Sequence, residues 1–199
     1  LEDYQNTKYA QNYEDLVSYA KKVDKEVGNG SQFSTAVLKN YFKLMAYKDE
    51  YEVSRLMTNK KFSDDINKNF EGNFSYNFYL APPIFSKKSK VDGKLLKIKF
   101  GGWLFNVFKL ISKFKFLRGT KFDPFGYLNE RKKERELIRD YKQTIVYIGS
   151  KINKSNYETA VKIASIPDQI RGFGHVKEKN IKEAIKNRTD LLNSFHENS

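Results

Sequence analysis

The sequence predicts a mainly α single domain with about six helices and a small antiparallel β ribbon. Over most of the chain, apolar side chains recur every three or four residues, which is the period of a helix that buries one face. Between residues 71 and 102 the period falls to two, which is typical of a half-buried strand. Apolar residues make up 39% of the 199 residues and aromatic residues 15%, so the chain can bury a core.

The first two helices are predicted before residue 60. One spans about residues 4–25, and Gly28-Asn29-Gly30 ends it. The other begins after Ser34, a candidate N-cap, and continues to about Asn59. The centre of this second helix is unusually polar, with three charged residues on adjacent turns: Lys48, Glu52 and Arg55. We interpret these charges as an ion network between helices in preference to a catalytic Lys–Glu pair.

The β ribbon is predicted from two runs in which apolar and polar side chains alternate. The runs cover residues 74–80 and 96–100, and we expect them to pair antiparallel. Pro82-Pro83 ends the first run, because proline cannot donate a ladder hydrogen bond, and Asp92-Gly93 supplies a turn.

Four further helices complete the predicted fold. They cover about residues 103–117, residues 128–150, a short stretch from Ser155 to just before Pro167, and residues 176–195. Ser155-Asn156-Tyr157-Glu158 matches a capping box at the start of the short helix. Asp123 before Pro124 suits an N-cap that is followed by proline at the first helical position.

The helix over residues 103–117 has two interpretations. Its apolar face and flanking lysines resemble a helix that lies in a membrane interface. A core helix, or one buried against a neighbouring domain, has the same pattern, because a separated domain exposes whatever surface once docked to its neighbour. We favour the second interpretation over membrane binding.

The composition argues against catalysis by this chain. It has no cysteine, which excludes disulfides, cysteine-ligated zinc, iron–sulfur ligation and thiol nucleophiles. A histidine metal site or a Ser-His-Asp triad would have to use His175, since the other histidine, His196, lies in a polar tail. The chain opens with Leu1-Glu2-Asp3 and contains neither a signal peptide nor a long apolar span, so we expect a cytoplasmic fragment of something longer.

The positive charge is concentrated in one segment. The net charge is +13, and residues 87–121 hold eleven Lys and Arg against one acid, which leaves an excess of ten. Such asymmetry suggests a face for nucleic acid, anionic lipid or an acidic protein, although genome composition alone also produces lysine-rich surfaces. Four candidate interaction residues come from this segment: Lys109, Lys113, Lys115 and Arg118.

A second candidate is the glycine-bearing loop Arg171-Gly172-Phe173-Gly174-His175-Val176-Lys177, which opens the last helix. Backbone N–H groups at a helix start, beside Arg171, His175 and Lys177, can hold a carboxylate or a phosphate. The run is neither a P-loop nor a dinucleotide fingerprint, because it lacks Gly-Lys-Ser/Thr and no strand precedes it. A tight turn between helices also explains the two glycines, and the sequence alone favours that explanation.

Several blocks of the chain, in order, resemble the C-terminal part of the long, fused indolepyruvate ferredoxin oxidoreductases. The blocks are Tyr41-Phe42-Lys43-Leu44-Met45-Ala46-Tyr47-Lys48-Asp49-Glu50-Tyr51-Glu52-Val53-Ser54-Arg55-Leu56, Leu80-Ala81-Pro82-Pro83, Leu117-Arg118-Gly119-Thr120, Phe122-Asp123-Pro124-Phe125-Gly126-Tyr127 and Gln169-Ile170-Arg171-Gly172-Phe173-Gly174-His175-Val176-Lys177. The opening, Asp3-Tyr4-Gln5-Asn6 with Tyr9-Ala10, is similar to the segment that follows the family's gamma-type domain. The resemblance covers essentially all 199 residues.

The resemblance implies a setting for this chain without a chemistry of its own. Members of that family decarboxylate aryl 2-oxoacids with thiamine diphosphate and magnesium, pass electrons through iron–sulfur clusters to ferredoxin, and form an acyl-CoA. The motifs for these cofactors belong to upstream domains, so the resemblance places no cofactor, metal or catalytic residue here. The role of the domain itself does not follow from the resemblance. We expect a non-catalytic accessory domain that packs against the upstream catalytic domains of its own polypeptide or of a dimer mate in a homo-oligomer.

Two hypotheses and two rivals follow from these observations. The basic segment helps to dock acidic ferredoxin, or Arg171, His175 and Lys177 face a cofactor phosphate or an acidic neighbouring surface. The main rival is a nucleic-acid-binding module, favoured by lysines interleaved with Phe and Tyr. Only seven of the 37 basic residues are Arg, which is poor for base readout. An independent enzyme is the least favoured function.

Overall fold

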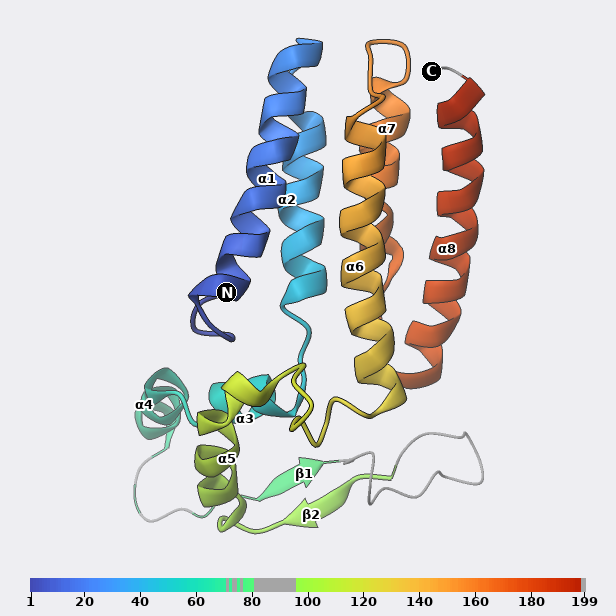
Figure 1. The fold of residues 1–199 in the computed structure, drawn as a ribbon. Helices are drawn as coiled ribbons and strands as arrows, with labels where there is room; N and C mark the ends of the chain where they lie inside the picture. Colours follow the sequence, from blue (N-terminus) through green and yellow to red (C-terminus); the bar gives the residue numbers. More distant parts are fainter. Residues whose placement is uncertain (71, 73–74, 76, 81–95, 198–199) are drawn as a thin grey trace. The chain divides into compact units, whose positions relative to one another are not determined.

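The computed structural model describes residues 1–70, 72, 75, 77–80 and 96–197, without the side chains of residues 63 and 67. Over these residues the chain forms eight α-helices, two short 3-10 helices and one two-stranded antiparallel sheet (Figure 1). The predicted mainly α class with a small ribbon is confirmed. The chain divides into two compact units: Leu1–Tyr47 with Pro124–Ser199, called the bundle unit, and Lys48–Asp123, called the inserted unit.

The bundle unit consists of helices that run antiparallel to their neighbours along the chain (Figure 1). Its elements are α1 (Thr7–Val27), α2 (Gln32–Met45), α6 (Asn129–Gly149), α7 (Tyr157–Ala164), the 3-10 helix η2 (Ile166–Gln169) and α8 (Gly174–Glu197). Helix α2 is central, because it packs against α1, α6, α7 and η2. Every fourth residue of α2 is therefore fully buried: Phe33, Val37, Tyr41 and Met45.

Aromatic side chains link the helices of the bundle unit. The rings of Tyr13, Tyr41 and Tyr141, from α1, α2 and α6, stack in series with centroid separations of 6.0 and 5.9 Å. The Tyr141 hydroxyl is buried and donates to the carbonyl of Ala164 at 2.7 Å, which ties α6 to the end of α7. Part of the aromatic content noted in the sequence thus lies in this core, where the Tyr141 hydroxyl is hydrogen bonded.

The start of α2 is held by residues from other helices, which corrects the predicted N-cap at Ser34. The helix begins at Gln32, and Ser34 lies inside it, where its backbone N–H donates to Asp24 Oδ2 at 2.8 Å. The Tyr157 hydroxyl donates to Asp24 Oδ1 at 2.8 Å and accepts from the backbone N–H groups of Gln32 and Phe33. A carboxylate from α1 and a phenol from α7 therefore satisfy the N–H groups that a local cap would have satisfied.

The inserted unit is built from short elements around a small core. Its elements are α3 (Glu50–Met57), α4 (Lys60–Asn69), β1 (Phe78–Leu80), β2 (Ile98–Phe100), α5 (Leu104–Lys113) and the 3-10 helix η1 (Lys115–Leu117). The strands pair antiparallel, as the alternating runs predict, and the structure places Tyr79 opposite Lys99. Helix α5 packs against α3, and its Phe108 meets Phe78 of β1 edge to face at 5.3 Å. The predicted stop at Pro82-Pro83 and turn at Asp92-Gly93 lie outside the described residues.

The prediction of one continuous helix over residues 35–59 is wrong. Helix α2 ends at Met45, and α3 begins at Glu50 after a break. At the break Asp49 has an extended backbone, and its carboxylate accepts the backbone N–H of Glu52 at 2.8 Å. The polar centre noted in the sequence is therefore an N-cap between two helices.

Other boundaries also differ from the predictions. Helix α4 was not predicted, because its sequence is polar and has only two apolar residues, Phe62 and Ile66, which are too few to establish a period. The predicted helix over residues 103–117 is α5 followed by the 3-10 helix η1. Asp123 is not the N-cap of α6, which starts at Asn129, and the N-cap of α7 is Asn156 in place of Ser155. Asn156 is fully buried and accepts the backbone N–H of Asn153, which shifts the start by one residue.

Candidate functional site

The structure divides the sequence-predicted site residues between the two units. Lys109, Lys113, Lys115 and Arg118 belong to the inserted unit, and Arg171, His175 and Lys177 belong to the bundle unit. Each group is therefore described within its own unit.

Helix α5 carries apolar and cationic side chains side by side on its outer surface. Leu110 and Phe114 lie one turn apart and are 58% and 42% exposed, and Trp103, seven residues before Leu110, is 60% exposed. Lys109 and Lys113 lie one turn apart on the adjacent stripe and are exposed. We call the following residues the α5 surface: Trp103, Lys109, Leu110, Lys113, Phe114, Lys115 and Phe116.

The α5 surface exists because the inserted unit buries little of its longest apolar helix. Of the α5 residues only Leu104 and Phe108 are buried, at 8% and 6% exposure. Lys109 lies over the ring of Phe105, with its Nζ 4.8 Å from the ring centroid, which holds this cation beside the apolar stripe. The arrangement joins large apolar contacts to fixed positive charge, which suits a partner that is acidic and partly apolar.

Arg118 does not contribute to the α5 surface, which corrects its selection as an interaction residue. Its side chain is 3% exposed, and its guanidinium forms a bidentate pair with the buried carboxylate of Asp49. Nε lies 2.6 Å from Asp49 Oδ2, and Nη2 lies 2.8 Å from Oδ1. The charge of Arg118 is thus neutralised by Asp49 inside the inserted unit.

Asp49 and Arg118 belong to a buried network that closes the two ends of the inserted unit. Asp123 accepts the Tyr51 hydroxyl at 3.1 Å and the backbone N–H of Gly119 at 2.8 Å. Burial, reinforced by the charge and hydrogen bond of Asp123, raises the pKa of Tyr51 well above its ordinary range, so this phenol stays protonated. We call Asp49, Tyr51, Arg118 and Asp123 the stem network; its roles are structural, because every one of these side chains is engaged by another.

The stem network brings together three of the sequence blocks that carry the family resemblance. Asp49 and Tyr51 come from the first block, Arg118 from Leu117-Arg118-Gly119-Thr120, and Asp123 from the block that begins at Phe122. Sequence reasoning missed the role of Asp49, although an aspartate before Glu50-Tyr51-Glu52 is a recognisable N-cap signal.

The charges predicted to pair around α3 do so only in part. Arg55 forms a bidentate pair with Glu52, with both nitrogen–oxygen distances at 2.8 Å. Lys48 precedes α3 and makes no ion pair with any residue that the structure describes. The pair links two turns of one helix, which is simpler than the predicted network between helices.

The glycine-bearing loop forms as predicted, and α8 begins at Gly174. Gly172 has φ +90°, and a Cβ there would lie 2.9 Å from Val176 Cγ1, so the turn requires glycine. Arg171 Nε donates to the carbonyl of Asp168 at 2.9 Å, while Phe173 at the tip is 83% exposed.

The three candidate residues of this loop have different surroundings. Lys177 Nζ pairs with Glu134 Oε1 of α6 at 2.6 Å. His175 is exposed and, in the part of the chain that the structure covers, makes no hydrogen bond or ion pair. Arg171 is exposed, and its guanidinium has no carboxylate within ion-pair distance among the described residues. The loop thus presents one unpaired guanidinium, while Lys177 is already neutralised.

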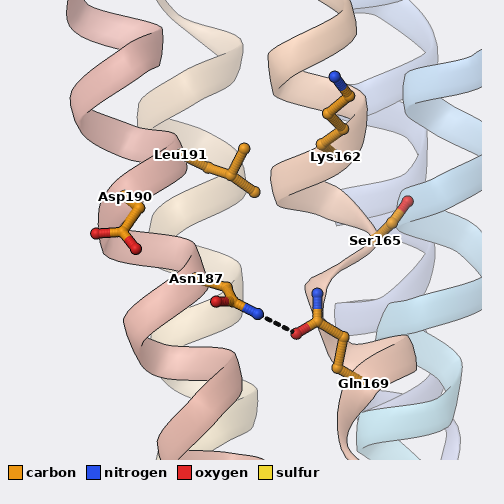
Figure 2. Close-up of a pocket in the computed structure, with 6 residues that line it drawn as sticks. All are labelled: Lys162, Ser165, Gln169, Asn187, Asp190 and Leu191. Carbon is orange, nitrogen blue, oxygen red and sulfur yellow. Dashed lines mark hydrogen bonds between the residues drawn. The ribbon is translucent and has the colours of Figure 1, made fainter.

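An open groove of about 480 Å³ lies between the α7–η2 segment and α8 (Figure 2). Six residues line it: Lys162, Ser165, Gln169, Asn187, Asp190 and Leu191. Gln169 and Asn187 bridge its two walls through a 2.8 Å hydrogen bond, and the Ser165 hydroxyl donates to the carbonyl of Val161. Ser165 is therefore turned into its own helix, and the groove offers hydrogen-bonding groups without an activated nucleophile.

Two findings limit the classes of site within the described residues. They contain no group of three or more carboxylate or histidine side chains placed to hold a metal ion. No helix among them is long and apolar enough to cross a membrane.

Comparison with protein-family models places almost the whole chain in one family. Residues 1–190 match the model of DUF6537, which is described as a family of unknown function. No curated protein and no solved structure matches the chain.

Proposed function

This chain belongs to the DUF6537 family, and we propose that it is the non-catalytic C-terminal domain of a thiamine-diphosphate-dependent indolepyruvate, or related 2-oxoacid, ferredoxin oxidoreductase. The proposal rests on the ordered sequence blocks given above, which span both units. In it, the thiamine diphosphate, magnesium, iron–sulfur clusters and CoA are bound by upstream catalytic domains. The enzyme is cytoplasmic and homo-oligomeric.

The role proposed for the domain is docking of the acidic electron carrier, ferredoxin, and the α5 surface is the observation that supports it. Lys109 and Lys113 stand free of acidic partners among the described residues, beside exposed Leu110 and Phe114. Complementary charge mainly accelerates encounter, and apolar contacts then hold the complex. The combination fits a transient partner that must bind and leave at each turnover.

Charge reversal in the full-length polypeptide tests this role. The triple variant Lys109→Glu, Lys113→Glu, Lys115→Glu should slow ferredoxin reduction by about tenfold or more at low ionic strength, because steering is lost. It should also flatten the dependence of that rate on salt. Turnover with a small artificial electron acceptor should stay unchanged, because such an acceptor needs no docking.

The matched control reverses three exposed lysines of the bundle unit: Lys21, Lys142 and Lys182. It changes the net charge equally, so it separates a local effect from a general one. Equal rates for the two triple variants would refute docking at the α5 surface. Absence of 2-oxoacid turnover from the full-length wild-type protein would refute the parent activity instead.

A second candidate function is binding of single-stranded nucleic acid. It is favoured by the exposed rings of Trp103, Phe114 and Phe116 among lysines, since bases stack on such rings and lysines follow the phosphates. Fluorescence anisotropy with a random oligonucleotide, measured over a range of salt concentrations, distinguishes the two functions. Saturable, salt-dependent binding that is lost in the α5 triple variant supports this candidate.

A further inference from the structure

The bundle unit assembles a cationic cluster that is not apparent in the linear sequence. Lys39 and Lys43 project from α2 to the carboxylate of Asp168 in η2, with nitrogen–oxygen distances of 2.9 and 3.8 Å. Arg171 contacts the same residue, because its Nε donates a hydrogen bond to the backbone carbonyl of Asp168 at 2.9 Å. Two ammonium groups therefore pair with one carboxylate, and a third cation lies beside the same residue.

A second acid–base group lies on the neighbouring helices. Glu134 of α6 is shared by Lys177 of α8, at 2.6 Å, and Arg131 of α6, at 2.9 Å. Around Asp168, three cations (Lys39, Lys43 and Arg171) accompany one carboxylate, which leaves two positive charges in excess within this group.

The excess charge acts at Lys43 most directly. Its ammonium donates to the carbonyl of Pro167 at 2.7 Å, and its side chain is 35% exposed. Burial lowers the pKa of Lys43, and Asp168 opposes this effect while Arg171, Lys39 and Lys177 lower the pKa further. A bound anion would relieve this repulsion, which is a favourable contribution that an isolated surface lysine cannot provide.

We infer that Lys39, Lys43 and Arg171 form a binding site for a phosphate group carried by a small molecule. A phosphate monoester carries about −1.5 to −2 charges at neutral pH, so it matches the unbalanced charge better than one carboxylate does. The guanidinium of Arg171, with no carboxylate within ion-pair distance among the described residues, supplies a planar fork that suits phosphate oxygens. Lys43 supplies a partly desolvated ammonium, where a charge–charge contact is stronger than in open water.

The inference concerns the bundle unit alone and does not rest on the proposed function of the α5 surface. Its test uses hydrogen–deuterium exchange of the full-length protein, because peptides covering residues 36–45 and 168–180 report on this site separately from any other phosphate site. The probes are inorganic phosphate, inorganic pyrophosphate and ADP. Both peptides should gain protection in a saturable manner, whereas a peptide from α1 should not.

Two variants establish which side chains hold the anion. Arg171→Gln and Lys39→Gln alter exposed side chains, so the fold should persist, and each should raise the half-saturating anion concentration by about tenfold. Lys142→Gln on α6 is the matched control and should leave it unchanged. Inorganic phosphate that protects as well as ADP would identify free phosphate as the ligand, and tighter protection by ADP would identify a phosphoester.

Three results would overturn the inference. They are an absence of protection by any of the anions, equal protection in wild type and the Arg171→Gln variant, and stronger protection by a polyglutamate peptide than by pyrophosphate. The last result would assign the cluster to an acidic protein partner in place of a small molecule.

Discussion

The stem network makes a quantitative prediction about the stability of the inserted unit. Asp49→Asn keeps the amide oxygen that caps α3 but removes the negative charge from Arg118, whose side chain is 3% exposed. A guanidinium left buried without its partner is strongly destabilising, because water cannot reach it to replace the carboxylate. We expect the free energy of unfolding of the inserted unit to fall by about 3–5 kcal/mol.

The assay must report on the inserted unit itself, because a chain with two compact units need not unfold in a single step. Native-state hydrogen exchange of amides in α3 and α5 gives the free energy of opening there, and amides of α1 serve as the internal reference. The matched control is Glu52→Gln on the same helix, whose partner Arg55 is 31% exposed and can be solvated. That variant should cost about 0–1 kcal/mol.

A double variant separates the ion pair from the cap. The single variant Arg118→Met leaves the carboxylate of Asp49 buried without its cation. The double variant Asp49→Asn, Arg118→Met removes both charges. The double variant should therefore be less destabilised than the sum of the single variants, with a coupling free energy of at least about 1 kcal/mol. A loss below about 1 kcal/mol for Asp49→Asn, or strict additivity, would refute the assignment of the stem network as the main constraint on this unit.

Three further predictions concern the bundle unit. Tyr157→Phe leaves Asp24 Oδ1 without its buried donor and should lower the free energy of thermal or urea unfolding by about 1–3 kcal/mol. Burial, with a smaller contribution from Asp15, raises the pKa of Tyr41 to about 12. The stability that the protonated phenol contributes is complete below the unfolded pKa near 10 and is lost as the pH rises toward about 12. Tyr41→Phe should therefore make the free energy of unfolding less dependent on alkaline pH. Gly172→Ala places a side chain at φ +90° and should lower the melting temperature through about 1–3 kcal/mol of strain.

Each of these predictions has a distinct point of failure. An unchanged unfolding midpoint for Tyr157→Phe would mean that the backbone N–H groups of α2 are satisfied without this phenol. Identical alkaline unfolding curves for wild type and Tyr41→Phe would show that the ionisation of Tyr41 is not coupled to unfolding. Gly172→Ala should be only partly rescued by Val176→Ala, which removes the 2.9 Å contact but not the backbone strain, and full rescue would contradict the strain argument.

Helices with an uninterrupted apolar stripe could be predicted from the sequence. The prediction of residues 4–25 for α1 is close to the observed Thr7–Val27, and the expected glycine terminus is Gly28, whose φ is +69°. The ribbon was predicted as well, because the runs that contain residues 78–80 and 98–100 alternate with period two, whereas its register comes from the structure. These features depend on side chains a few positions apart, so local order in the chain is sufficient to reveal them.

The break between α2 and α3 depended on a partner that is distant in the sequence. Apolar and aromatic residues recur on both sides of the polar centre, and this spacing alone favours one helix. The carboxylate of Asp49 is held by Arg118, which lies 69 positions away, and this pair stabilises the extended backbone at Asp49. The same pair removed Arg118 from the predicted basic surface, because a count of charges does not show which of them are neutralised by burial.

Composition and periodicity thus determine that this chain is helical, basic and free of thiol chemistry, because those properties belong to residues individually or to neighbours along one face. The tertiary structure decides which charges meet. Lys43 on α2 lies more than a hundred positions from both Asp168 in η2 and Lys177 on α8. In the folded bundle unit it nevertheless interacts electrostatically with both. Electrostatic interactions depend on distance in space, and only the packing of α2, α6, η2 and α8 brings these side chains within that range.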